Sequence, residues 1–320
     1  MFLSPEVLAK SATGLEEITP AEESGTENTG ILENRAEYEQ TPQAQSIPQI
    51  TEPQQQSESE NVGYAITAQN FAVSELSVNP CDSKASYDAL SALNEGYPPS
   101  LQTGITKEPL VLIIHTHATE SFAEEGVTQY PENTAFRSTD PEKNMIAVGR
   151  VMTDVLNSAG VPTLHCEVQY DAEDYNTAYN KSLAGTKEYL AKYPSLKYVF
   201  DVHRDAIVRD NGEMVKTYCN IDGKDCAQVM ILVGTNSSGA DHPDWAEHLN
   251  VAMKIQSSLL GNYPSFARAV SLRGASFNQQ YAPGSLLFEI GSCANTLSEA
   301  KYAASLLATE IAKTILTFSA

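Results

Sequence analysis

From Pro109 onward, short apolar runs alternate with segments whose apolar residues recur every three or four positions. Residues 110–114 are continuously apolar, as in a strand buried on both faces of a sheet. Residues 141–159 have helical spacing, with Thr139 or Asp140 as the expected cap and Gly160 as the expected end. Strands that alternate with helices form mostly parallel sheets covered on both sides. The sequence therefore predicts an α/β fold, with a mostly parallel twisted sheet and helices on both faces.

The same patterns place the other elements. We expect further strands at 161–166, 197–203, 269–273 and 285–290, and further helices at 86–94, 180–193, 243–260 and from Thr296 onward. The last helix starts with a capping box, in which Thr296 and Glu299 exchange hydrogen bonds with each other's backbone.

A hairpin is expected around Asp222-Gly223, with arms at 215–221 and 227–233. In a two-residue turn Cys219 lies directly opposite Cys226, with Cα atoms ~4.5–5.5 Å apart, which is within disulfide reach. A disulfide in an oxidising compartment and two free thiols both fit this pairing. The chain has five cysteines and no CxxC pair, which argues against a four-thiolate zinc site.

Residues 1–104 differ in composition, with acidic, Gln-rich and Pro-containing runs. Such a segment buries too little apolar surface to offset its ordering entropy, so we expect a disordered acidic linker or tether before a domain at 105–320. The chain contains no apolar stretch of ~18 residues, the length that a membrane-spanning helix needs. Its N-terminus lacks a signal-peptide pattern. The net charge of -21 excludes nucleic acid as a partner of the bulk surface.

Three expected strands end in residues that can do chemistry. The segments at these ends are His115-Thr-His117-Ala-Thr-Glu120, Asp201-Val-His203-Arg204-Asp205 and Phe288-Glu289-Ile-Gly. In parallel α/β sheets, sites gather at the carboxyl ends of strands. Two histidines and one carboxylate are the ligand set of a catalytic zinc with an open fourth position. The sequence therefore predicts a zinc site at this edge of the sheet.

The third ligand is open among Glu120, Asp140 and Glu142. Asp140 also suits a helix N-cap, and His115 is a reserve ligand in place of His117 because it lies two residues earlier on the same side of the strand. Serine catalysis is the weaker alternative, because Ser121 and Ser292 lack the G-x-S-x-G elbow. Cys293 likewise has no cysteine-protease signature around it.

Several separated motifs resemble, in order, those of the stage II sporulation protein P family. They are HTHATES, TDPEKN, FDVHRD, HPDWAEHLNVAMKIQ and LLFEIGSCANTLSEA, within residues 105–320. That family resembles the zinc-dependent N-acetylmuramoyl-L-alanine amidases. The resemblance implies a peptidoglycan amidase, and also an endopeptidase on stem peptides, that acts in forespore engulfment beside a lytic transglycosylase. It also implies a place on the extracytoplasmic face of the septal or mother-cell membrane.

Carried over by motif, the resemblance implies His117, Asp140 and His203 as zinc ligands and Glu289 as the catalytic residue. Asp140 stands where the amidase pattern has Glu, and Thr116 stands where it has Gly. Glu120 and Arg204 are assigned to substrate binding or to support of the ligands, with a structural ion pair as the alternative.

Glu289 is expected to act as acid and base, because burial raises the pKa of a carboxyl and a nearby zinc ion lowers it. A group tuned near the working pH can accept a proton from water and pass it to the leaving amine. The alternative is a buried salt bridge to Arg204 or Arg273.

Two other functions compete with the amidase. The first is a non-catalytic cell-wall-binding scaffold on the same fold, and the second is a zinc peptidase without cell-wall specificity. The retained His117, His203 and Glu289 favour an enzyme, because a scaffold gains nothing from ionisable groups at strand ends.

Overall fold

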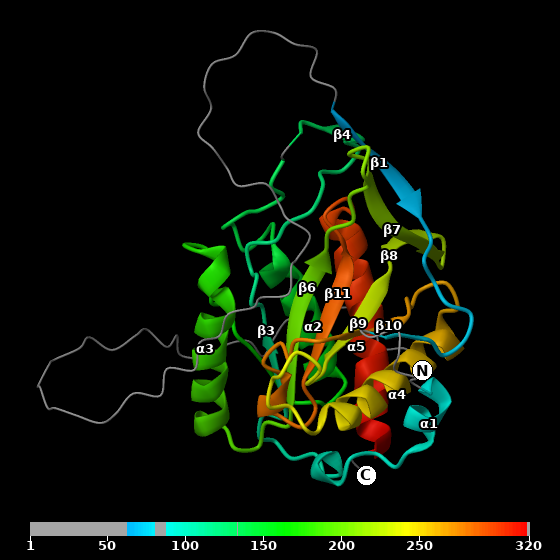
Figure 1. Cartoon of the computed structure of the whole chain (residues 1–320). Helices are drawn as coiled ribbons and strands as arrows, with labels where there is room; N and C mark the ends of the chain where they lie inside the picture. The colour runs from blue at the N-terminus through cyan, green and yellow to red at the C-terminus, as the bar shows by residue number, and fades with distance from the viewer. Residues whose placement is uncertain (1–62, 81–87, 133, 319–320) are drawn as a thin grey trace, which may run out of the picture. The chain divides into compact units, whose positions relative to one another are not determined.

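The structure is a computed structural model that describes residues 63–80, 88–132 and 134–318. A seven-stranded sheet lies at its centre (Figure 1). In order across the sheet the strands are β2 (Val78–Asn79), β10 (Val270–Arg273), β9 (Val229–Gly234), β11 (Leu286–Ser292), β6 (Tyr198–Asp205), β3 (Val111–Ile114) and β5 (Thr163–His165). Only the β11–β9 pair is antiparallel within the described sheet. The predicted α/β fold with a mostly parallel sheet is confirmed.

Helices cover both faces of this sheet. α2 (Met145–Ser158), α4 (Trp245–Asn262) and α5 (Leu297–Phe318) share one buried cluster with Phe200 and Phe288 of the sheet. α3 (Ala178–Lys192) packs on the opposite face against Leu112 and Ile114. Successive strand residues point to opposite faces, so a run that is apolar at every position can serve both layers.

The two helix starts that we predicted have different outcomes. Thr296 and Glu299 form the expected capping box, because the Thr296 amide donates to Glu299 Oε2 at 3.1 Å and the Glu299 amide donates to Thr296 Oγ1 at 3.3 Å. The expected cap of α2 at Thr139 or Asp140 is wrong. Residues 141–143 form a turn, and Asn144 caps the helix by accepting a hydrogen bond from the Ile146 amide at 3.0 Å.

A smaller sheet has the order β4-β1-β7-β8. Its strands are β4 (Gln129–Tyr130), β1 (Tyr64–Gln69), β7 (Met214–Ile221) and β8 (Lys224–Ala227). The hairpin of β7 and β8 is confirmed, and Cys219 is paired with Cys226 as predicted. Both are free thiols, so a bridge between them stays a prediction. The second arm ends at Ala227, since after Gln228 the chain enters β9 of the large sheet.

The folded part begins well before the boundary expected at residues 104 and 105. β1 pairs in parallel with β7, β2 pairs in parallel with β10, and α1 (Ala89–Asn94) is joined to α4. Asn250 Nδ2 donates to Ala92 O at 2.7 Å across that helix contact. Within the expected tether, residues 63–80 and 88–101 therefore include strands and a helix that contact elements remote in sequence. Residues 1–62 and 81–87 of the expected tether lie outside the described residues. Among the described helices, none has the length and apolarity needed to cross a bilayer.

Candidate metal centre

The carboxyl ends of β3, β6 and β11 meet at one edge of the large sheet, because these three strands are adjacent and parallel. His117 and Glu120 lie on the loop after β3, His203 lies on β6, and Glu289 lies on β11. The loop turns sharply after Ile114, and the Glu120 amide closes a turn by donating to His117 O at 3.2 Å. This turn brings the His117 and Glu120 side chains toward the end of β6.

His117, Glu120 and His203 form one buried cluster whose candidate ligand atoms all lie within 4.8 Å of one another. Glu120 is at its centre. Its Oε1 is 3.9 Å from His117 Nδ1, and its Oε2 is 3.6 Å from His203 Nδ1. Two imidazoles and one carboxylate are therefore close enough to bind a single metal ion.

Arg204 fastens the loop to β6. Its backbone amide donates to Glu120 Oε2 at 3.3 Å, and its guanidinium donates to Ser121 O at 3.0 Å and to Phe136 O at 2.9 Å. Nη1 is 3.8 Å from Glu120 Oε1. Arg204 is buried, and its guanidinium is occupied by these backbone oxygens. This places Arg204 in the support of the cluster, as a structural cation beside Glu120.

The electrostatics of the cluster follow from burial and close charges. Burial raises the pKa of Glu120, but the charges of Arg204, His203 and His117 lower it by more than burial raises it. The pKa is therefore below its ordinary value and the carboxyl stays ionised. Burial lowers the pKa of His117 to about 4, so this imidazole is neutral at pH 7. Burial lowers the pKa of His203 as well, but the carboxylates of Asp201 and Glu120 outweigh it and raise the pKa well above the ordinary value.

Asp201 stands behind His203. Its Oδ1 is 2.8 Å from His203 Nε2, although the two are not aligned as a hydrogen bond, and it accepts from the Thr116 amide at 2.8 Å. Its Oδ2 accepts from Thr116 Oγ1 at 2.6 Å. A carboxylate on the far nitrogen of a ligating histidine orients the ring and raises its basicity. The strand-end motif includes Asp201, but the sequence assigned it no role, although strand alternation places it two residues before His203 on the same face.

The cluster fits a bound metal ion. His117 Nε2 is a buried side-chain atom without a hydrogen-bond partner in the described structure, and so is Glu289 Oε2 nearby. Leaving such atoms unpaired is costly, and an ion would remove part of that cost. Two histidines and one carboxylate are a donor set that zinc takes in catalytic sites.

Glu289 is the fourth functional group at this edge. It pairs in register with His203 on β6 and with Met230 on β9. Burial, then the negative charge of Asp205, raise the pKa of Glu289 to about 8, while His203 lowers it. The described residues include no ion-pair partner within 4.0 Å for Glu289, so the alternative of a salt bridge to Arg204 or Arg273 is absent there.

Three other candidate ligands lie elsewhere. Asp140 is on the surface, where it accepts from the Glu142 amide at 3.0 Å, and Glu142 pairs with Arg150. His115 uses both ring nitrogens inside the core, at 2.7 Å from Val202 O and 2.8 Å from His165 Nε2. Glu120 lies in the cluster and Asp140 does not, because residues 141–143 form a surface turn instead of the first turn of a helix.

Aromatic side chains enclose His117, and no sequence pattern indicated them. Tyr175, on the short 3-10 helix Tyr175–Thr177, stacks on the His117 ring with centroids 4.1 Å apart. Tyr179 contacts the same ring edge-on at 5.5 Å, and Phe277 packs on Tyr179. Phe277 and Asn278 both have positive φ, of 51° and 57°. Two consecutive non-glycine residues in this region mark a strained loop, which is typical of functional sites.

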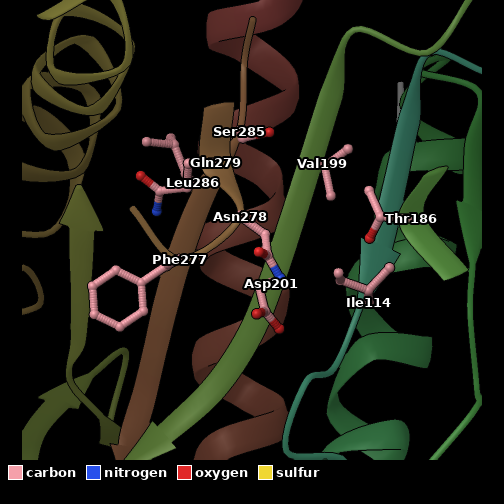
Figure 2. Close-up of a pocket in the computed structure, with 9 residues that line it drawn as sticks. All are labelled: Ile114, Thr186, Val199, Asp201, Phe277, Asn278, Gln279, Ser285 and Leu286. Atoms are coloured by element: carbon pink, nitrogen blue, oxygen red, sulfur yellow. The ribbon is translucent and has the colours of Figure 1, made fainter. Parts of the chain in front are cut away.

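A small cavity lies on the α3 face of the sheet beside Asp201 (Figure 2). Its wall combines β3, β6 and α3 with the loop before β11. The lining residues are Ile114, Thr186, Val199, Asp201, Phe277, Asn278, Gln279, Ser285 and Leu286. None of the lining residues belongs to the cluster, so the cavity adjoins the candidate centre through Asp201 without containing it.

Comparisons with known proteins give the family and related folds. The sequence profile of the stage II sporulation protein P family matches residues 6–312. Stage II sporulation protein P of Bacillus subtilis (strain 168) is 27% identical over 218 residues, which are 65% of this chain and 51% of that protein. The chain thus spans about half the length of this curated relative.

Two solved amidase structures are similar to this fold. The CwlD amidase from Clostridioides difficile, in complex with the GerS lipoprotein, is 15% identical with a TM-score of 0.43, covering 66% of this chain and 98% of that one. The N-acetylmuramoyl-L-alanine amidase AmiC2 of Nostoc punctiforme is 14% identical with a TM-score of 0.37, covering 67% of this chain and 98% of that one.

Proposed function

This chain belongs to the stage II sporulation protein P family, and we propose that it is a zinc-dependent N-acetylmuramoyl-L-alanine amidase that hydrolyses peptidoglycan during sporulation. The observation that carries the proposal is the buried cluster of His117, Glu120 and His203, with Glu289 paired beside His203. Histidines and a carboxylate converge here at the carboxyl edge of the sheet, where α/β enzymes hold their sites.

In this proposal His117, Glu120 and His203 would hold a zinc ion. The chemistry that zinc supplies when bound is polarisation of a carbonyl group and a lowered pKa for water. Asp201 fixes the orientation of His203, and Arg204 fixes Glu120. These contacts hold the ligands in place before substrate arrives, which is what precise catalysis requires.

Glu289 moves the proton. Amide hydrolysis requires that a proton leave the attacking water and that a proton reach the departing nitrogen. A carboxyl whose pKa is raised to about 8 is a stronger base than an ordinary glutamate and still an effective acid near neutral pH. Its unpaired, buried Oε2 leaves one oxygen free for this exchange.

The finer assignments come from the motif resemblance and belong to the proposal. They are endopeptidase action on cross-linked stem peptides, work in forespore engulfment beside a lytic transglycosylase, and a place on the extracytoplasmic face of the membrane. Peptidoglycan itself is the expected partner, and the net charge of -21 argues against nucleic acid.

Digestion of purified sacculi, with mass analysis of the released fragments, tests the function. An amidase releases free stem peptides and leaves glycan without peptide, whereas an endopeptidase cuts the cross-links and leaves the stem peptides on the sugar. Glu289→Gln should abolish release, while Glu188→Gln, an exposed carboxyl on α3, should retain it. Binding to sacculi without any release would favour the scaffold, and cleavage of unrelated peptides at the same rate would favour the unspecific peptidase.

A further inference from the structure

A column of three side chains leads away from the metal cluster. The Tyr175 ring stacks on His117 with centroids 4.1 Å apart and planes 17° apart. The Arg137 guanidinium carbon lies over the same Tyr175 ring at 4.5 Å from its centroid. Two groups this close to one centroid must occupy opposite faces of the ring. Arg137 is therefore separated from the candidate metal ligand by the thickness of one tyrosine.

One edge of the Arg137 guanidinium is anchored and the other is free. Nη1 donates to Thr119 Oγ1 at 2.8 Å and to Asp171 Oδ2 at 2.7 Å. Thr119 itself donates to both oxygens of Asp171, from its amide at 3.1 Å and its hydroxyl at 2.6 Å. A guanidinium has N–H donors on three nitrogens. No acceptor among the described residues bonds Nε or Nη2, and the side chain is 26% exposed.

The backbone before Arg137 is held in a strained conformation. Phe136 has a φ of 44°, which is a genuine outlier for a bulky residue. Its carbonyl is fixed by two hydrogen bonds, from the Ser121 amide and from Arg204 Nη2, each 2.9 Å long. The same loop carries Glu120, so the direction of Arg137 is tied to the position of the metal cluster. Strain that persists beside a site points to a functional role.

The free edge of Arg137 suits one chemical class of ligand. A planar guanidinium on an aromatic ring binds carboxylates through parallel hydrogen bonds. The chain carries a net charge of -21, so an anionic substrate needs local positive charge to approach the site. A peptidoglycan stem peptide provides a carboxylate at the right distance. Its second residue, a glutamate linked through its side chain, keeps a free α-carboxylate, and two extended residues span roughly 7 Å.

We propose that Arg137, supported by Tyr175, is the subsite that binds the free α-carboxylate of the second stem-peptide residue. This inference rests on the proposed function and specifies its substrate. A purely structural ion pair with Asp171 would account for Nη1 alone. Such an ion pair would not explain why Nε and Nη2 lack an acceptor, why the side chain is partly exposed, or why it contacts Tyr175.

Binding of two short ligands to the metal-free protein, by calorimetry, tests the subsite without any catalysis. The first ligand is N-acetyl-L-Ala-D-Glu γ-methylamide, and the second differs only by an α-carboxamide in place of the α-carboxylate. We expect the carboxylate ligand to bind roughly 10-fold more tightly, as for hydrogen bonds to a charged group. Equal affinity for the two ligands in the wild-type protein would overturn the proposal.

Variants then assign the effect to Arg137. Arg137→Gln should bring the two ligands to equal affinity, while Lys143→Gln, which removes a charge from a side chain that is 73% exposed, should keep the wild-type ratio. If the ratio of the two affinities is unchanged in Arg137→Gln, another residue binds the carboxylate and the assignment is refuted. If Arg137→Gln does not fold, Arg137→Lys keeps a cation beside Asp171 and should still lose most of the discrimination, since lysine lacks the fork.

The outcomes separate this inference from the proposed function. Discrimination between the ligands by a protein that releases nothing from sacculi would support the subsite and refute the amidase. Release from sacculi without discrimination would support the amidase and refute the subsite.

Discussion

Glu289 lies directly opposite His203 in the parallel pairing of β11 with β6. Residues paired in this way project from the same face of the sheet, so the carboxyl and the imidazole share one side of the candidate centre. Glu289 is the one member of the site whose carboxyl pKa is raised, to about 8, whereas that of Glu120 is lowered. Two carboxyls with opposite shifts indicate different tasks: Glu120 stays charged and suits a ligand, and Glu289 can exchange a proton.

Glu289→Gln keeps the shape of the side chain and removes its proton chemistry. We expect a rate loss of ~10²–10⁴-fold, the usual contribution of a general acid and base, with zinc content retained. Release of peptide from sacculi measures the rate, and elemental analysis measures the zinc. Full activity in this variant would remove Glu289 from the mechanism, and loss of zinc would make it a ligand.

The same variant should change how the stability of the metal-free protein depends on pH. The pKa of Glu289 is raised from 4.5 to about 8 in the folded protein, so between these values the folded state binds a proton that the unfolded state has lost. The wild-type free energy of unfolding therefore contains a contribution that is present at low pH and is lost as pH rises toward 8. Glu289→Gln lacks this dependence. Its melting temperature should exceed that of the wild type more at pH 8 than at pH 5, and a constant difference would contradict the raised pKa.

Zinc content should depend on Glu120 and be independent of Asp140. Wild-type protein should bind about one zinc per chain, and Glu120→Gln or His117→Ala should lose most of it. Asp140→Asn and Glu142→Gln should keep it, because both carboxylates lie on the surface away from the cluster. The reverse pattern would restore the ligand set implied by the amidase motifs.

Arg204 should matter more for stability than any exposed arginine. Arg204→Met leaves Glu120 without its buried cation and the Ser121 and Phe136 carbonyls without a donor. We expect a loss of ~3–5 kcal/mol in the free energy of unfolding, as for one partner of a buried pair, measured by urea denaturation. Arg209→Met is the control, since that arginine pairs with Glu213 at the surface and should cost ~1 kcal/mol or less.

The sequence predicted the sheet, and it placed at the sheet edge three of the four residues that lie together in the candidate centre, for a clear physical reason. An uninterrupted apolar run such as 110–114 is stable only when both faces are covered, and a polar residue that follows it lies at the sheet edge. His117, His203 and Glu289 could be found this way. The choice of Glu120 over Asp140 could not, because it depends on the turn at residues 116–119, where side-chain directions follow no period.

Contacts between segments far apart in sequence were also beyond prediction. Arg137 reaches Asp171 and Tyr175 through loops whose paths no local pattern specifies. β1 and β2 lie in a segment that reads as polar linker, yet both are ordered by strands more than a hundred residues away. Short strands of this kind derive their stability from their partners, so their own residues carry little signal.

The parallel pairing of β1 with β7 bears on how this protein can be shortened. Residues Ile66 to Gln69 pair in register with Met214 to Thr217, and Val78 pairs with Val270 of β10. A fragment that starts at residue 105 would strip β1 from β7 and β2 from β10, leaving two rows of unpaired backbone groups open to water. Bare strand edges recruit strands from other molecules. Aggregation of such a fragment would then reflect the missing strands, with the His117, Glu120 and His203 cluster itself intact.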